Sequence, residues 1–247
     1  MNDIPLNERV IFALDVADAG EAKRLVDLLR GEIGFFKVGL QLFLAGGWPM
    51  IDYITERGCK VMADLKFFDI PETVALAVEQ LQNHDIALAT IHGNDPIIRA
   101  AVARKKDDMK LLAVTVLTSF DESDMRQLGL RGTIADLVLL RAQKAIDLGC
   151  DGVVSSGLEV KSLRDNVGDS FIVVTPGIRP GINADVIGQD DQKRVATAKE
   201  AMENGADHVV IGRPIRDAKD PLAMARSIKE EIAQALAAKR LFDGRPN

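Results

Sequence analysis

The sequence predicts a single-domain (β/α)8 barrel that spans residues 1–247, and three observations support this prediction. Eight short apolar runs alternate with longer segments of helical periodicity from one end of the chain to the other. The runs are almost continuously apolar, as expected of parallel strands that are buried on both faces. The length of 247 residues also suits this architecture, which takes about 250 residues as one domain.

The eight predicted strands follow one another along the whole chain. They are rich in Val, Ile, Leu and Phe, residue types that suit a buried strand. In chain order the strands are expected at residues 10–15, 35–39, 60–66, 88–92, 111–118, 152–156, 171–175 and 208–212.

The segments between the strands have the spacing of amphipathic helices. Apolar residues recur three and four positions apart in residues 22–33 and again in 134–146, so each segment presents one apolar stripe. The charged segment 221–239 is expected to be a last helix that covers the barrel. The turn after the first strand has no GxGxxG motif, which disfavours a doubly wound sheet. Four glycines stand where helix C-termini are expected, namely Gly31, Gly58, Gly149 and Gly205.

Composition and charge exclude several functional classes. The chain has 31 Lys and Arg against 37 Asp and Glu, a net charge of −6, and no basic run, so neither nucleic acid nor an anionic membrane is an expected partner. No apolar stretch approaches the roughly 20 residues of a membrane span. Residues 1–9 are too polar for a signal peptide. The only cysteines, Cys59 and Cys150, form no CxxC pair, and together these features predict a cytoplasmic protein.

Polar and ionisable residues gather at the ends of the predicted strands. In a barrel of this kind these ends meet on one face, which is where catalytic groups lie. A single buried charge is compatible with a structural ion pair, but so many at one end indicate a polar active site. The residues concerned are Asp15, Lys37, Asp64, Lys66, Asp69, His92, Thr118, Ser119, Ser155, Ser156, Thr175, Arg179 and Arg213.

The densest cluster lies at residues 64–71, at the end of the third predicted strand. Asp64 and Lys66 are two positions apart, so their side chains point to the same side of an extended strand. Asp69 lies beyond the strand, and Pro71 suits the first turn of a helix. A lysine between carboxylates stays charged, which favours a proton donor over a Schiff-base nucleophile. The alternative is a structural salt bridge inside the barrel.

Residues 64–71, with the sequence DLKFFDIP, resemble the DxKxxDIP signature of the orotidine 5′-phosphate decarboxylase family. Other segments agree with that family in the same order, among them TPGIRP at 175–180 and IGR at 211–213. The resemblance extends over residues 9–240. It implies a (β/α)8 barrel that decarboxylates orotidine 5′-phosphate to UMP in pyrimidine biosynthesis, with no cofactor or metal, as a homodimer with shared active sites.

The resemblance also implies roles for individual residues. Lys66 is expected to protonate C6 of the substrate, with Asp64 beside the substrate carboxylate. Asp69 is expected to reach into the neighbouring subunit's site together with Ile70 and Thr73. The remaining expected substrate contacts are Asp15 and Lys37 at the ribose, Thr118 and Ser119 at the pyrimidine, Arg179, Gln192, Gly212 and Arg213 at the phosphate, and Pro176. Lys37 is also expected to join the charged network.

The segment 179–195 is the longest predicted irregular stretch, and a loop of that length in a compact domain is usually functional. It is a few residues longer than the family pattern, so Gln189 competes with Gln192 for the phosphate contact. Because the phosphate is remote from the reacting carbon, its binding energy is expected to drive closure of this loop.

Two other functions are compatible with a barrel of this kind. A Mg²⁺-dependent sugar-phosphate decarboxylase or synthase shares the DxKxxD pattern. It is disfavoured by Ile70-Pro71 and by Lys37, which stands where a metal ligand is expected. A non-catalytic phosphate-binding barrel would keep Arg179 and Arg213 but would not require Lys66.

Overall fold

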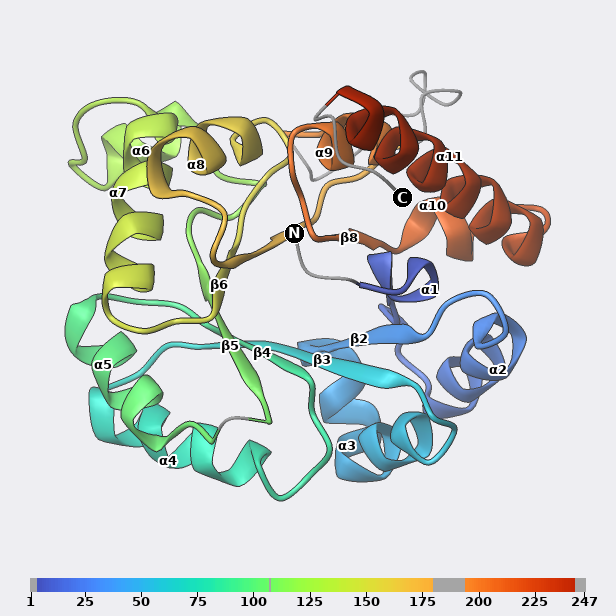
Figure 1. Ribbon diagram of the computed structural model, residues 1–247. Coiled ribbons are helices and arrows are strands. Elements are labelled where there is room, and N and C mark those ends of the chain that lie inside the picture. Colours follow the sequence, from blue (N-terminus) through green and yellow to red (C-terminus); the bar gives the residue numbers. More distant parts are fainter. Residues whose placement is uncertain (1–3, 107, 180–193, 243–247) are drawn as a thin grey trace.

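The computed structural model describes residues 4–106, 108–179 and 194–242. Its strands form a closed barrel in which every strand is parallel to its sequence neighbours, and the eighth strand pairs with the first. The helices form a ring around these strands (Figure 1). The predicted (β/α)8 barrel is therefore confirmed. The strands are β1 Val10–Ala13, β2 Phe35–Gly39, β3 Lys60–Phe67, β4 Leu88–Ile91, β5 Lys110–Val114, β6 Gly152–Val154, β7 Ile172–Thr175 and β8 His208–Ile211.

Most helices begin at local signals that are visible in the sequence. Asp18 accepts a hydrogen bond from the Glu21 backbone at the start of α2, and Thr133 forms a capping box at the start of α7. Pro71 is the first residue of α4, as predicted. Among the described helices, none has the length and apolar character needed to cross a bilayer. The helices are α1 Leu6–Arg9, α2 Ala19–Leu29, α3 Leu40–Thr55, α4 Pro71–Leu81, α5 Asp95–Arg104, α6 Glu122–Gln127, α7 Ile134–Asp147, α8 Val160–Val167, α9 Ala198–Glu203, α10 Arg213–Arg216 and α11 Pro221–Phe242.

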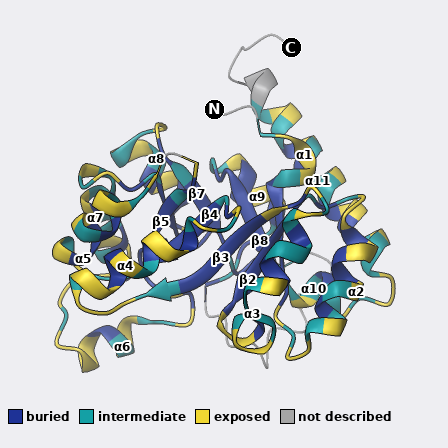
Figure 2. Ribbon diagram, turned by 90° about the horizontal axis from the view of Figure 1, so that it is seen from below, coloured by how far each residue is buried: buried dark blue, intermediate teal, exposed yellow. Residues whose placement is uncertain are grey.

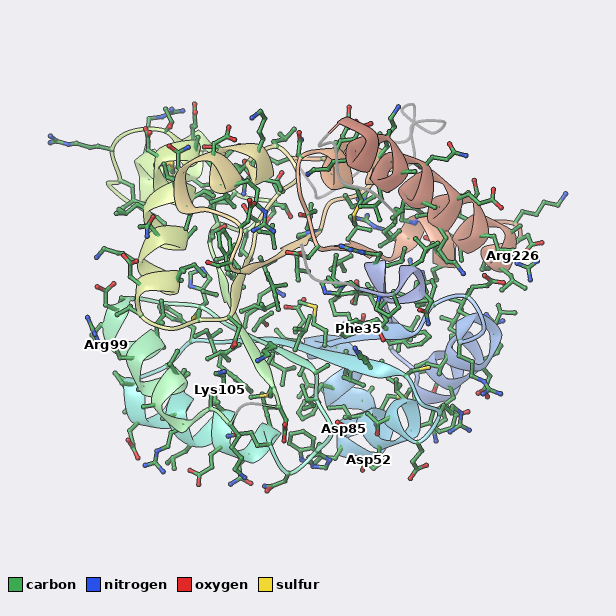
Figure 3. All side chains as sticks on the ribbon, viewed as in Figure 1. Phe35, Asp52, Asp85, Arg99, Lys105 and Arg226 are labelled. Carbon is green, nitrogen blue, oxygen red and sulfur yellow. The ribbon has the colours of Figure 1, made fainter. Side chains whose placement is uncertain are left out.

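The strands separate two apolar clusters, and this alternation positions the site. One cluster fills the barrel interior, where Phe35, Met62 and Leu88 lie with seven further buried residues. The other joins the outer faces of the strands to the helices. Figure 2 shows the buried strands at the centre and the exposed residues on the outer helices. In Figure 3, Phe35 lies over the central strands, whereas Arg99 and Arg226 lie at the outer edge of the molecule.

Some details of the sequence prediction are wrong, and several strands end earlier than predicted, such as β1 at Ala13 and β6 at Val154. The fifth strand ends at Val114, not at residue 118, because the carbonyls of Val116 and Leu117 accept hydrogen bonds from Arg194 and not from a neighbouring strand. Leu28, which belongs to the predicted stripe in residues 22–33, is 37% exposed. The four predicted glycines do follow helix ends: Gly58, Gly149 and Gly205 have the positive φ of helix-terminating glycines, and Gly31 directly follows the C-cap Arg30 of α2 without a positive φ.

Candidate active site

Charged residues follow the interior-facing apolar residues of three adjacent strands. Side chains alternate along a strand, so Lys37 points the same way as Phe35 in β2. Asp64 likewise follows Met62 in β3, with Lys66 two positions later, and Asp15 follows the end of β1. The barrel interior thus changes from apolar to charged at the carboxyl ends of β1, β2 and β3, where this fold places its active sites.

These four residues form a row of alternating charges. Asp15 Oδ1 accepts a hydrogen bond from Lys37 Nζ at 2.8 Å. Lys37 Nζ lies 3.5 Å from Asp64 Oδ2, and the same oxygen is 2.8 Å from Lys66 Nζ. The predicted common face of Asp64 and Lys66 is confirmed by this short contact. Each internal member of the row has an opposite charge on both sides, which offsets the cost of removing it from water.

Burial and charge act in opposite directions on the two central members of the row. Burial raises the pKa of the Asp64 carboxyl, but Lys37 and Lys66, with hydrogen bonds from Lys66 and Thr90, bring it below its ordinary value. Burial lowers the pKa of the Lys37 ammonium, but Asp64 and Asp15 raise it above its ordinary value. Both groups are therefore held in their charged forms at neutral pH.

A cavity of about 530 Å³ opens over this row at the carboxyl ends of the strands. That volume lies in the range of small-ligand sites, about 300–1,000 Å³. Most of the predicted site residues line it. These residues are Asp15, Lys37, Asp64, Lys66, Thr118, Ser119, Pro176, Arg179, Gly212 and Arg213.

The cavity has a cationic end and a less charged end. Arg179 follows β7, and Arg213 and Arg216 belong to the short helix after β8; all three line the cavity. In barrels of this type, the loops after the seventh and eighth strands frequently bind phosphate. On another side the lining comes from the segment after β5, which contains Thr118 and Ser119. The arrangement suits an anionic ligand that carries a neutral polar group.

Asp69, Ile70 and Thr73 do not lie with the other predicted site residues in the cavity. All three are exposed, and none of them is among the residues that line the cavity. The Asp69 carboxylate accepts a hydrogen bond from the Ile70 backbone at 2.6 Å. Within one chain, these side chains are displayed at the surface beside the site.

Gln189 and Gln192 lie outside the described residues, as does most of the predicted loop 179–195. The two ends of that segment are described and lie close together. Arg179 donates its backbone hydrogen to the Ala196 carbonyl at 2.9 Å, and the Ala196 backbone donates to Gly177. The segment therefore starts and ends beside the cavity.

The sequence analysis missed Gln41 and Arg216, which line the cavity, and two buried residues next to it. Thr90 is fully buried in β4, where its hydroxyl contacts both Asp64 and Lys66. Arg194 is also buried and binds Glu159 and two carbonyls of the segment after β5. The one available signal for Thr90 was a polar residue inside an otherwise apolar strand. Arg194 belongs to the segment 191–194 that agrees with the family pattern, but its role could not be assigned from the sequence because its partners are 35 and 77–78 positions away.

The carboxylates of the cavity are engaged by lysines. Within the residues that the structure describes, no group of three or more His, Cys, Asp or Glu side chains is placed to hold a metal ion. Asp64 contacts two ammonium groups, and Asp15 contacts one of the same two. Cationic side chains thus occupy the positions around these carboxylates where a divalent ion would need further oxygen ligands.

Comparisons with known proteins agree on one family. Residues 8–228 match the family described as "Orotidine 5'-phosphate decarboxylase / HUMPS family". An orotidine 5′-phosphate decarboxylase of Methylococcus capsulatus is 50% identical over 236 residues, which cover 95% of this chain and 96% of the relative. One of Stenotrophomonas maltophilia is 45% identical over 235 residues, with 94% and 96% covered. The crystal structure of orotidine 5′-phosphate decarboxylase from Lactobacillus acidophilus superposes with a TM-score of 0.79 at 37% identity, covering 91% of this chain and 99% of the other.

Proposed function

Because this chain belongs to the orotidine 5′-phosphate decarboxylase / HUMPS family, we propose that Lys66 and Asp64 are the centre of its decarboxylation of orotidine 5′-phosphate to UMP. The chain is a carboxy-lyase of pyrimidine biosynthesis. The observation that carries the assignment of residues is the row of alternating charges, Asp15–Lys37–Asp64–Lys66, at the base of the cavity.

Lys66 is the proton donor in this proposal. When the bond between C6 and the carboxylate breaks, its electron pair stays on C6 and CO₂ leaves. The ammonium of Lys66 stabilises the developing negative charge electrostatically and then transfers a proton to C6, which leaves a neutral amine that regains a proton from water. The Asp64 carboxylate, 2.8 Å from Lys66 Nζ, holds this group in place before the reaction.

Asp64 also shapes the ground state. The substrate carboxylate would lie beside the Asp64 carboxylate, and two like charges at short range repel each other. That repulsion is relieved when the substrate carboxylate departs as neutral CO₂. Lys37, which lies 3.5 Å from Asp64 and 2.8 Å from Asp15, keeps Asp64 ionised so that this repulsion is present.

The other lining residues bind the remaining parts of the substrate. Asp15 and Lys37 would hold the ribose hydroxyls. The phosphate would lie at the cationic end, where Arg179, Gly212 and Arg213 line the cavity. The pyrimidine would then point toward Thr118, Ser119 and Pro176. With the phosphate bound at a distance from C6, its binding energy can organise the site without touching the reacting carbon.

The competing interpretation of the DxKxxD pattern is a Mg²⁺-dependent sugar-phosphate decarboxylase or synthase. The proposal favours metal-free chemistry because the ammonium groups of Lys37 and Lys66 already neutralise Asp64. Assays with and without EDTA test this point. Activity that persists in EDTA supports the proposal. Activity that collapses in EDTA and returns with Mg²⁺ would overturn it.

The direct test follows the loss of orotate absorbance when the purified protein is mixed with orotidine 5′-phosphate. The parent is expected to convert the substrate, and Lys66→Ala to lose about 10,000-fold or more in kcat, because it lacks both the charge and the proton. Lys60→Ala is the matched control, since Lys60 lies at the exposed start of the same strand and pairs with Glu8. A folded Lys66→Ala protein with substantial activity would refute the role of Lys66.

A homodimer with shared sites is the second part of the proposal. Asp69, Ile70 and Thr73 are exposed beside the site, and Phe68 and Ile70 are 68% and 66% exposed although both are large and apolar. A second copy that covers this surface would bring its Asp69 toward Lys66. The ammonium of Lys66, which is partly exposed, would then lie between carboxylates of two subunits.

Mixing two inactive variants tests the shared site. Lys66→Ala and Asp69→Ala homodimers should both be nearly inactive. In their heterodimer, one site has an intact Lys66 together with an intact partner Asp69, and the other site lacks both. Unfolding and refolding equal amounts together should therefore restore about a quarter of the parental activity, if the chains pair at random. A mixture shown to contain heterodimers, but no more active than its parents, would mean that Asp69 acts in its own subunit's site.

We also assign the enzyme to the cytoplasm. Its two cysteines, Cys59 and Cys150, are free and buried. Burial raises the pKa of the Cys150 thiol to about 12, so this thiol is unreactive. Unpaired structural thiols are typical of proteins that function in a reducing compartment.

A further inference from the structure

Thr90 lies directly beneath the catalytic pair, inside the barrel. It is the third residue of β4 and is fully buried. Its hydroxyl accepts a hydrogen bond from the Lys66 backbone at 3.0 Å and donates one to Asp64 Oδ1 at 3.0 Å. A threonine hydroxyl has one hydrogen to donate, and here that hydrogen is given to Asp64.

The backbone opposite Thr90 is irregular. In the pairing of β3 with β4, Ala63 is opposite Ala89 and Phe67 is opposite Ile91. Three residues of β3, from 64 to 66, are therefore matched by Thr90 alone, which is a bulge in the ladder. Lys66 has a φ of 48°, and among the described residues it is the one non-glycine with positive φ. That conformation is unfavourable for a residue with a side chain, and it persists only where neighbouring groups enforce it.

At this bulge, the Thr90 hydroxyl takes the place of a backbone carbonyl as a hydrogen-bond acceptor. By accepting the Lys66 N–H, it supplies a buried backbone donor with a partner in the strained region. By donating to Asp64 Oδ1, it also fixes the rotation of the carboxylate. The other oxygen, Oδ2, then faces Lys37 at 3.5 Å and Lys66 at 2.8 Å.

We propose that Thr90 is a positioning residue for the decarboxylation, which holds the Lys66 backbone and the Asp64 carboxylate in register through one hydroxyl. This inference rests on the proposed roles of Lys66 and Asp64. Thr90 acts through Lys66 and Asp64 and does not contact the substrate, so loss of its hydroxyl should lower kcat and leave ligand binding unchanged.

The experiment compares Thr90→Val with Thr115→Val. Valine keeps the size and β-branching of threonine but removes the hydroxyl. Thr115 is the matched control because it is also fully buried, and its hydroxyl donates to the Val154 carbonyl of a neighbouring strand. The measurements are kcat for orotidine 5′-phosphate, the dissociation constant of UMP by calorimetry, and the melting temperature.

Thr90→Val should lower kcat by about 10- to 100-fold, the effect of losing a hydrogen bond to a charged group. UMP affinity should stay within about twofold. Thr90→Ser, which restores the hydroxyl, should recover most of kcat, and Thr115→Val should keep it. If Thr90→Val does not fold, Thr90→Ala carries the same expectations. A hydroxyl-free Thr90 variant with parental kcat would overturn the proposal, as would one that loses kcat and UMP affinity equally.

A second readout separates this proposal from the proposed function. The Asp64 carboxyl can be titrated by ¹³C NMR in the free enzyme, where it is flanked by Lys37 from β2, Lys66 from β3 and Thr90 from β4. Removing the Thr90 donor should raise the Asp64 pKa. An unchanged titration refutes the positioning role even if the parent is active. If the Asp64 pKa rises in the Thr90 variant but the parent fails to decarboxylate, the hold of Thr90 on Asp64 stands and the proposed function is refuted.

Discussion

Replacing Arg194 with methionine is expected to weaken both the fold and the reaction. Arg194 and Glu159 each have about 10% of their side chains exposed, and they form an ion pair of 2.7 Å. The same guanidinium donates to the Val116 and Leu117 carbonyls at 3.0 Å each. Methionine fills much of the same volume but leaves the Glu159 carboxylate buried without its partner.

The size of the effect follows from that buried carboxylate. Removing one member of a buried ion pair costs about 3–5 kcal/mol of unfolding free energy. The carboxyl can escape by taking up a proton, which at pH 7 costs a glutamic acid about 3.7 kcal/mol. The loss should therefore lie near 3–4 kcal/mol, which for a domain of this size lowers the melting temperature by about 6–16 °C. Because protonation becomes easier in acid, the difference from the parent should shrink toward pH 5.

The catalytic effect has a separate cause. The two carbonyls held by Arg194 immediately precede Thr118 and Ser119, which line the cavity. Without the guanidinium, this segment loses its connection to the chain beyond β7. We expect a higher KM for orotidine 5′-phosphate, because the groups assigned to the pyrimidine are no longer held in place.

A double variant separates the two effects. Arg194→Met with Glu159→Leu removes both charges, so the unfolding free energy should return to within about 1 kcal/mol of the parent. The carbonyls of Val116 and Leu117 remain without their donor, so KM should stay raised. The assays are thermal denaturation at pH 7 and pH 5 and steady-state decarboxylation. A single variant that melts within about 2 °C of the parent at pH 7 would refute the reasoning, as would a double variant with parental KM.

Three further predictions concern the phosphate end, pH and the barrel wall. Arg213→Ala should lower kcat/KM for orotidine 5′-phosphate by about 10- to 100-fold while its melting temperature stays parental; parental kinetics would exclude a phosphate contact. Burial lowers the pKa of His208, so the folded protein keeps a neutral ring where the unfolded chain takes up a proton below about pH 6.5. Stability should therefore fall as pH drops from 6.5 to 5, by up to about 1.4 kcal/mol per pH unit, and His208→Gln should flatten that slope in denaturant titrations. Gly152→Ala should destabilise the barrel by about 2 kcal/mol or more, because its Cβ would lie 2.2 Å from the Ile172 carbonyl oxygen. Gly31→Ala, with no atom within 4 Å of the added Cβ, is the control, and equal melting temperatures for the two variants would contradict the prediction.

The sequence was sufficient for the fold because its signals are local. Nearly continuous apolar runs and helical stripes required no knowledge of long-range contacts, and strand bounds agreed closely for β2 at 35–39. The pairing of Asp64 with Lys66 was equally accessible, because it depends on a spacing of two within one strand. The family signature then supplied most of the other polar lining residues, but not Gln41 or Arg216.

Contacts between strands were not accessible in the same way. Lys37 reaches Asp15 because it is paired with Ala13 across the β1–β2 ladder, and that register is a property of the closed barrel. Thr90 meets Lys66 only because the β3–β4 pairing shifts between Ala63 and Phe67. The end of β5 was misplaced for a related reason, since Arg194 binds the carbonyls that a longer strand would have used. Each of these features depends on pairing between distant segments.

The charged row explains why the site tolerates so many buried ions. Each internal charge contacts an opposite charge on both sides, either on its own strand or on an adjacent one, so removing one member leaves the next without compensation. The row ends at Lys66, whose side chain is 34% exposed, compared with 10% for Lys37 and for Asp64. The proposed proton donor is thus the most accessible cation of the row, and it lies where a substrate can reach it. The buried members hold this accessible ammonium in place from below, and Thr90 fixes the strained backbone that carries it.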